Sequence, residues 1–428
     1  MNKEKSNSKY ILVLSASLFS MFFGAGNLIF PSYVGFTAGK SWLPAVLGFL
    51  MTGAGLPLLS VVASAKSDGD INNLGQKVSK FFSRFLGIAI VLSIGPLMAI
   101  PRTGATTFEM AVKPLMPGFS PVIFALIYFG LSLMLAINPR DIVDKIGKIL
   151  TPALFILLIL IIVLGIVNPL GEIVETDIDY PFSYGFEIGY QTMDALAALL
   201  FSGVIIYSIK NKGYDDTKTQ ISMTLKSGFI SIGALSLIYG GLGYLGATAT
   251  EAVGRDISKV ELIRLLAENS LKSFGSLGFS LVVALACLTT TIGLITTVGH
   301  YFNKLSGGRL SYRFLVSLTA LVGAILSVVG VDNIVRFSGP VLSFLYPMVI
   351  VLIVLTIGLS DSKYINVFRS SIFVTMLVSL VQLLIDFGLL APEFLAWLPL
   401  SQLGLAWLLP AMAAGLVGFF LRPRPASK

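Results

Sequence analysis

Long apolar runs alternating with short charged segments dominate the chain. About twelve of these runs reach the length that a bilayer requires. Their approximate limits are 10–36, 42–65, 81–106, 119–138, 149–168, 188–209, 221–246, 274–299, 311–330, 334–358, 366–387 and 403–421. Within each run apolar residues occupy nearly every helical face, as in helices surrounded by lipid or by other helices. The pattern predicts an all-α polytopic membrane protein that forms one domain over residues 1–428.

The first run is interrupted at the segment Phe22-Phe23-Gly24-Ala25-Gly26-Asn27-Leu28-Ile29-Phe30-Pro31. Two glycines and an asparagine are poor residues for a helix interior. In lipid, a broken backbone persists only where protein or a water-filled cavity satisfies its N–H and C=O groups. The interruption therefore predicts a binding site for a small polar solute or an ion. The alternative is a flexible or closely packed helix, because glycine is common in membrane helices.

The sixth run carries a carboxylate, Asp194, inside an apolar segment. A charge at that depth normally faces a partner, a cavity or an ion. Runs one and six are five apart, which predicts two inverted repeats, 10–168 and 188–358, each beginning with a broken helix. Runs eleven and twelve, 366–421, lie outside this repeat. The alternatives for Asp194 are a structural hydrogen bond or a position nearer the outer interface.

Consecutive hydroxyl groups in the eighth run are a third polar feature. Thr289, Thr290 and Thr291 follow Ala286 and Cys287. A monovalent cation such as sodium is well served by carbonyl and hydroxyl oxygens. Threonines in membrane helices also commonly donate to their own backbone one turn earlier, so the run by itself leaves both interpretations open. In the third run, Arg102 could form an outer gate with Glu109 or serve as a partner for helix-end carbonyls.

Composition narrows the class of function. The 428 residues are 55% hydrophobic and 12% charged, with a mean hydropathy of +0.88. A single cysteine, Cys287, excludes a disulfide framework. A single histidine, His300, argues against most zinc and catalytic sites, so we expect neither an enzyme nor a cofactor. We attribute the net charge of +8 to loops facing anionic lipid rather than to nucleic-acid binding.

Loop charges predict the orientation. Lysine and arginine gather at both chain ends and in every second loop, whereas the loop containing Glu172, Glu175, Asp177 and Asp179 has neither. By the positive-inside rule both termini are cytoplasmic. The segment Glu251–Ser273 breaks the pattern, with charges of both signs and helically spaced apolar residues. We expect it to be an outer-side helix over the mouth of the protein, or alternatively an ordinary solvated loop helix.

Four segments carry a resemblance to known families. Gly24-Ala25-Gly26-Asn27 resembles the unwound first helix of LeuT-type amino acid:sodium symporters, and Ala286-Cys287-Leu288-Thr289-Thr290 resembles their eighth helix. The chain is more similar to the bacterial branched-chain amino acid:cation symporters, over nearly its whole length. That similarity is carried by the stretches 19–31, 95–103 and 192–194.

The resemblance implies a LeuT-like fold in a bacterial inner membrane and sodium-driven import of leucine, isoleucine and valine. It implies that sodium meets the carbonyls of Ser20, Phe23 and Ala286 and the hydroxyls of Thr289 and Thr290. The expected substrate residues are Ala25, Gly26, Asn27, Met98, Asp194, Ala195, Leu199 and Leu200.

Within that set, backbone N–H groups of 25–27 would meet the substrate carboxylate, and carbonyls of an unwound stretch near 195–200 would meet the ammonium. Asp194 departs from the LeuT pattern. It could bind the ammonium, a second cation or a proton, so a proton-coupled symporter is the alternative. Apart from membrane lipid no macromolecular partner is expected, and the oligomeric state stays open.

Overall fold

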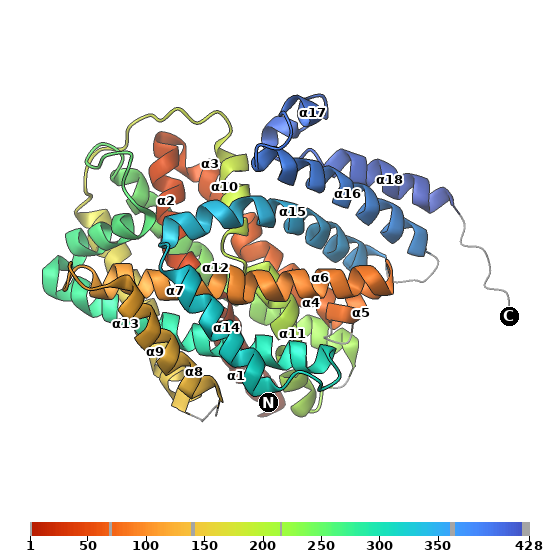
Figure 1. Cartoon of the computed structure of the whole chain (residues 1–428), viewed down its shortest axis with the longest axis horizontal. Helices are drawn as coiled ribbons and strands as arrows, with labels where there is room; N and C mark the ends of the chain where they lie inside the picture. Colours follow the sequence, from red (N-terminus) through yellow and green to blue (C-terminus); the bar gives the residue numbers. More distant parts are fainter. Residues whose placement is uncertain (1, 68–70, 138–141, 215, 360–363, 422–428) are drawn as a thin grey trace.

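The computed structural model describes residues 2–67, 71–137, 142–214, 216–359 and 364–421, and every regular element in these ranges is helical (Figure 1). The first half contains α1 (Asn2–Phe22), α2 (Ala25–Ala38), α3 (Trp42–Leu50), α4 (Leu56–Ala65), α5 (Ile71–Gln76), α6 (Lys80–Leu92), α7 (Ala99–Thr107), α8 (Pro121–Ile137) and α9 (Ile142–Val167). The second half contains α10 (Pro181–Tyr190), α11 (Asp194–Asn211), α12 (Thr217–Thr248), α13 (Lys259–Leu305), α14 (Tyr312–Ser327), α15 (Val331–Gly358), α16 (Ile365–Asp386), α17 (Glu393–Ala396) and α18 (Leu408–Phe420).

These helices fit a membrane-spanning protein. In the described ranges, 6 helical segments are long and apolar enough to cross a membrane, or 7 if the bent pair α10–α11 counts as one span. Shorter apolar helices, among them α8, α14 and α18, accompany them. The expected class, an all-helical polytopic membrane protein, is confirmed.

The first and sixth spans are broken, as the sequence predicts. The first break lies at Phe23 and Gly24, between α1 and α2. The second lies at 191–193, between α10 and α11, whose axes differ by 42°. The third span is also interrupted, because a π-helical turn (η3, Ser93–Leu97) and a non-helical Gly95 (φ −96°, ψ −123°) separate α6 from α7. Pro96 accounts for the distortion, since it lacks the N–H that a regular turn needs.

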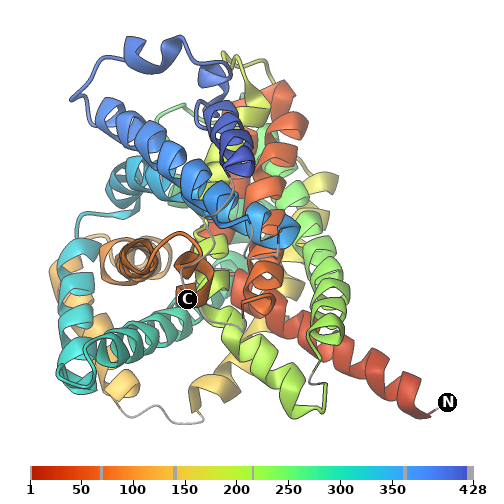
Figure 2. The same ribbon diagram turned by 90° about the vertical axis from the view of Figure 1, so that its right-hand side faces the viewer.

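Close backbone contacts hold the two broken spans in place. The pairs α2–α12 and α3–α10 pack against each other. A Cβ atom at Gly246 would lie 1.8 Å from the Ser32 carbonyl oxygen, and one at Gly185 would lie 1.7 Å from that of Ala45. Only glycine allows backbones to approach so closely, a device common where membrane helices meet. At the other side of the molecule, α16 and α18 lie side by side (Figure 2).

The segment expected as an outer-side helix forms the start of α13. The hydroxyl of Ser258 accepts a hydrogen bond from the Glu261 N–H and caps this helix. Val260, Ile263 and Leu266 are buried in the main apolar core. At Lys272 the backbone turns through φ 59°, and the helix continues as the eighth span. The buried apolar side excludes an ordinary solvated loop helix.

Candidate functional site

A cavity of about 80 Å³ lies between the breaks of the first and sixth spans. The third and eighth spans complete its wall, so four spans meet there. The residues that line it are Ser20, Phe23, Gly24, Ala25, Gly26, Asn27, Ile94, Ala99, Arg102, Thr103, Thr192, Met193, Asp194, Ala197, Phe201, Thr290 and Leu294. Polar groups from both breaks therefore face a common space inside the helical core.

The break in the first span is closed by a capping arrangement. Gly24 has an extended backbone, and its N–H donates to Asn27 Oδ1 at 3.1 Å. The Asn27 N–H in turn donates to the Gly24 carbonyl at 3.1 Å. The N–H groups of Ala25 and Gly26, in the first turn of α2, have no acceptor within their own helix. The helix dipole adds a partial positive charge at this end, so the turn favours an anionic group in the cavity.

Asn27 joins the two broken spans. Its side-chain Nδ2 donates to Asp194 Oδ2 at 2.5 Å, and also to the hydroxyl of Tyr239 on α12. Asn27 is 1% exposed and Asp194 is 6% exposed, so this contact is sealed from bulk solvent. Asp194 is also the first residue of α11, where a carboxylate is stabilised by the helix dipole. The side chains of 27 and 194 thus fix the starts of α2 and α11 relative to each other.

The break in the sixth span is shorter than expected and lies earlier in the chain. It consists of Gln191, Thr192 and Met193, and Met193 has a left-handed backbone with φ 60°. The expectation of an unwound stretch near 195–200 was wrong, because α11 is regular from Asp194 onward. The carbonyls of Gly189 and Tyr190 accept from the N–H groups of 192 and 193, so they are used within the protein.

Arg102 supplies a buried cation beside this break. Its Nη1 donates to the Gln191 carbonyl at 2.6 Å, and its guanidinium lies 5.3 Å from the centroid of the Phe30 ring. Arg102 is 3% exposed, and its Nε has no hydrogen-bond partner among the described residues. Of the two interpretations of Arg102, partner for a helix-end carbonyl is the one that this hydrogen bond supports. The same guanidinium lines the cavity together with Asp194.

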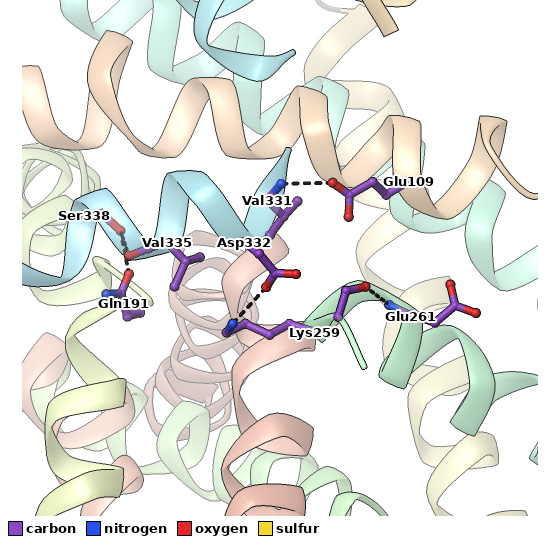
Figure 3. A network of polar contacts seen from close by, with 9 residues as sticks. Glu109, Gln191, Lys259, Glu261, Val331, Asp332, Val335 and Ser338 are labelled. Carbon is purple, nitrogen blue, oxygen red and sulfur yellow. Dashed lines mark hydrogen bonds and ion pairs between the residues drawn. The ribbon is translucent and has the colours of Figure 1, made fainter. Parts of the chain in front are cut away.

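A polar network lies beyond the break, at the start of α15 (Figure 3). The Ser338 hydroxyl donates to Gln191 Oε1 at 2.8 Å. Lys259 pairs with Asp332 at 2.8 Å, with its ammonium 4.4 Å from the Tyr33 ring centroid. Glu109 accepts from the Val331 N–H at 2.9 Å rather than pairing with Arg102. Side chains from the third and eighth spans therefore meet α15 above the broken sixth span.

The threonines of the eighth span make local hydrogen bonds. The hydroxyls of Thr289 and Thr290 both donate to the Ala286 carbonyl at 2.9 Å. Thr291 donates to the carbonyl of Cys287, whose side chain is 2% exposed. Each hydroxyl keeps lone pairs that can face a cation, but the carbonyl of Ala286 already accepts two protons.

The structure brings together some of the expected site residues and not others. Ser20, Phe23, Ala25, Gly26, Asn27, Asp194 and Thr290 line the common cavity. Ala286 and Thr289 lie on the same helix as Thr290 but are not among its lining residues, and Met98, Ala195, Leu199 and Leu200 are likewise absent from its wall. Met98, Ala195 and Leu199 are instead buried in the surrounding apolar core.

Sequence reasoning did not single out Ala197, and it placed Phe201 only near the pocket, outside the expected substrate residues. They lie three and seven residues after Asp194, on one face of α11, and both line the cavity. That spacing follows directly from helical periodicity once α11 is known to begin at Asp194. Sequence reasoning placed the helix start too late, and so selected the wrong face.

Comparisons with known proteins agree with this architecture. Residues 7–424 match the family described as "Branched-chain amino acid transport protein". The chain is 38% identical to the branched-chain amino acid permease BraB of Bacillus subtilis, over 96% of this chain and 95% of that one. It is also 38% identical to the branched-chain amino acid transport system 2 carrier protein of Pseudomonas aeruginosa, over 94% of each.

Solved structures resemble the fold at low sequence identity. Mhp1, a nucleobase-cation-symport-1 family transporter in a closed conformation, matches with a TM-score of 0.65 and 13% identity over 96% of this chain and 91% of that one. MhsT in complex with L-phenylalanine matches with a TM-score of 0.61 and 15% identity, over 95% and 97%. The expected LeuT-like fold is thereby confirmed. The family match and the permease relatives confirm the expectation of a transporter rather than an enzyme. Since the family match spans almost the whole length, the chain belongs to the branched-chain amino acid transport protein family.

Proposed function

We propose that the protein imports leucine, isoleucine and valine by sodium symport with alternating access, across a bacterial inner membrane with both termini in the cytoplasm. The observation that carries the proposal is the cavity between the two broken spans, where a buried carboxylate and a buried guanidinium face the same space. Broken helices at the centre of a membrane protein are typical of secondary transporters. The names of the relatives support the choice of substrate.

The polar groups of the cavity complement a zwitterion. The substrate carboxylate would accept from the N–H groups of Ala25 and Gly26 and approach Arg102, whose Nε is unpartnered. The ammonium would meet Asp194, because the freed carbonyls at 189–191 already have donors. Ala197, Phe201 and Leu294 supply apolar wall for the side chain. Burying such a side chain contributes about 1.5–3 kcal/mol, which favours apolar over polar amino acids.

Sodium would bind between the first and eighth spans. Ser20, Phe23 and Thr290 line the same cavity, so oxygen atoms from both spans are within reach of it. A cation held there links the two spans, and its release to the cytoplasm allows them to separate. A sodium ion that binds one conformation more tightly than the other shifts the equilibrium between them, and this difference in affinity couples the ion gradient to substrate movement.

Radiolabelled leucine uptake into proteoliposomes tests the proposal. An inward sodium gradient should drive uptake, whereas potassium in its place should not. Replacing Thr289 and Thr290 with Ala should weaken the sodium dependence, because two oxygen ligands are lost. Thr297→Ala is the matched control, since its hydroxyl donates to the Gly293 carbonyl one turn away, at 2.8 Å. Sodium activation that is unchanged in the double variant would refute the assignment.

Proton coupling is the second candidate, and the burial of Asp194 is the observation that favours it. A carboxylate inside a membrane protein is a common proton carrier. Uptake that persists without sodium and collapses with the pH gradient would select this mechanism. The hydroxyls of Thr289 and Thr290 would then be structural, in keeping with their hydrogen bonds to Ala286.

A further inference from the structure

A second polar cavity of about 80 Å³ lies away from the central one and shares no lining residue with it. It is enclosed by α10, α15, α16 and the segment that precedes α18. Two carboxylates, Glu187 at the end of α10 and Asp386 at the end of α16, face it. In the predicted orientation the end of α16 lies on the outer side of the membrane, and α10 runs from that side to the break in the sixth span.

The two carboxylates have no cationic partner. No lysine, arginine or histidine lines the cavity, and neither Glu187 nor Asp386 forms an ion pair with any residue that the structure describes. Gln382 Nε2 donates to Asp386 Oδ1 at 2.7 Å, and both carboxylates remain accessible to solvent. Two carboxylates therefore face one small space without a basic side chain, which is unfavourable for two negative charges unless a cation joins them or a proton neutralises one.

The loop before α18 is shaped around one of these carboxylates. Gly404 has a left-handed backbone with φ 64°, and a Cβ atom there would lie 1.5 Å from Glu187 Oε1. Any side chain at this position would displace the carboxylate. The glycine thus keeps Glu187 directed into the cavity between the helices.

Three deeply buried polar groups in the cavity wall lack partners. Tyr190 Oη, Ser379 Oγ and Trp407 Nε1 form no hydrogen bond within the part of the chain that the structure describes, although these residues are only 3%, 1% and 5% exposed. A buried polar atom without a partner is costly, and native proteins almost always satisfy such groups with protein, water or a ligand. The wall of the cavity therefore favours a polar ligand, an ion or water.

We infer that this cavity is a binding site for a divalent cation of the calcium class, held by Glu187 and Asp386. Two carboxylates balance two positive charges, and hydroxyl oxygens and water complete the six to eight oxygen ligands that calcium takes. Tyr190 on α10 and Ser379 on α16 both line the cavity and carry hydroxyl oxygens. The indole N–H of Trp407 would donate to a carboxylate oxygen or to cation-bound water.

Terbium luminescence tests the site, because Tb³⁺ substitutes for Ca²⁺ and emits when a nearby indole is excited. The purified full-length protein in detergent should show emission through Trp407, and calcium should displace it. Glu187→Gln combined with Asp386→Asn should weaken terbium binding about tenfold or more, since affinity follows the ligand charge. Trp407→Phe should abolish the emission excited at the long-wavelength edge of indole absorption, where tyrosine does not absorb, and leave radioactive calcium binding intact.

Glu172→Gln combined with Asp177→Asn is the matched control, because it removes two exposed carboxylates from the acidic loop. These changes should leave the indole-sensitised emission unchanged. Emission that is absent from the wild type, or that calcium does not displace, would overturn the inference whether or not the variants fold. Equal terbium affinity in the wild type and the Glu187/Asp386 variant would overturn it as well. None of these readouts depends on transport.

Discussion

The variant Gly26→Ala should show whether Arg102 contributes to leucine binding, because the added methyl group displaces the guanidinium of Arg102 and leaves the break in the first span in place. A Cβ atom at Gly26 would lie 3.0 Å from Arg102 Nη2, and 3.2 and 3.3 Å from two carbons of the Phe30 ring. Ordinary carbon contacts lie at about 3.5–4.0 Å, so Gly26→Ala must push the guanidinium away by a few tenths of an ångström. Arg102 then no longer fits between Gly26 and the Gln191 carbonyl.

The size of the effect follows from the hydrogen bond at risk. Arg102 donates to the Gln191 carbonyl at 2.6 Å. In the proposed site the guanidinium of Arg102 also approaches the substrate carboxylate. A hydrogen bond from a charged group contributes about 1.5–3 kcal/mol, so a shifted guanidinium that loses about 1 kcal/mol of this substrate contact corresponds to a roughly fivefold weaker leucine affinity. Alanine is a better helix former than glycine by about 1 kcal/mol, so the stability of the protein should not fall.

Leucine uptake into proteoliposomes, measured over a range of leucine concentrations, should show this as a raised KM. Gly24→Ala is the control within the same segment. Its Cβ atom would meet only Asn27 Oδ1, at 3.7 Å, and its extended backbone (φ −120°, ψ −172°) suits alanine. Equal impairment in the two variants, or a wild-type KM in Gly26→Ala, would refute the reasoning that places Arg102 at the substrate.

Three further outcomes are expected. Asp194→Asn removes a charge-assisted contact worth about 1.5–3 kcal/mol, so leucine binding should weaken by one to two orders of magnitude; unchanged affinity in an equilibrium binding assay would contradict this. A double-mutant cycle on Lys259 and Asp332, read by unfolding, should give a coupling of about 0.5–1 kcal/mol, whereas additive effects would mean that the pair is inert. Gly185→Ala should destabilise the protein by about 1–3 kcal/mol in a thermal unfolding assay, unlike Gly233→Ala, which has open space; equal midpoints would contradict the close packing.

The broken spans could be predicted because their signals are local. Gly24, Gly26 and Asn27 stand together in an apolar run, and Asp194 is conspicuous in another. Each residue type conflicts with a continuous helix in lipid. Apolar run length likewise predicts the helices, because every spanning segment must cover the same thickness of hydrocarbon.

The details of the breaks could not be predicted, because they depend on distant partners. Met193 adopts a left-handed backbone without being a glycine, and no neighbouring residue signals it. The hydrogen bond from Arg102 to Gln191 joins residues 89 positions apart. The contact between Gly404 and Glu187 depends on a loop near the end of the chain. Such pairings are determined by tertiary packing, which the pattern of one run does not contain.

The burial of Cys287 has a practical consequence. It is the chain's only cysteine, and it lies in the eighth span, 2% exposed. A thiol enclosed in apolar surroundings reacts slowly, so the protein is a natural background for thiol-specific labelling. Paired cysteines introduced at exposed sites on α12 and α15 would accept spin labels without removal of the native one. Distances between those labels, measured with and without leucine, would then follow the rearrangement of the helices in the otherwise unaltered protein.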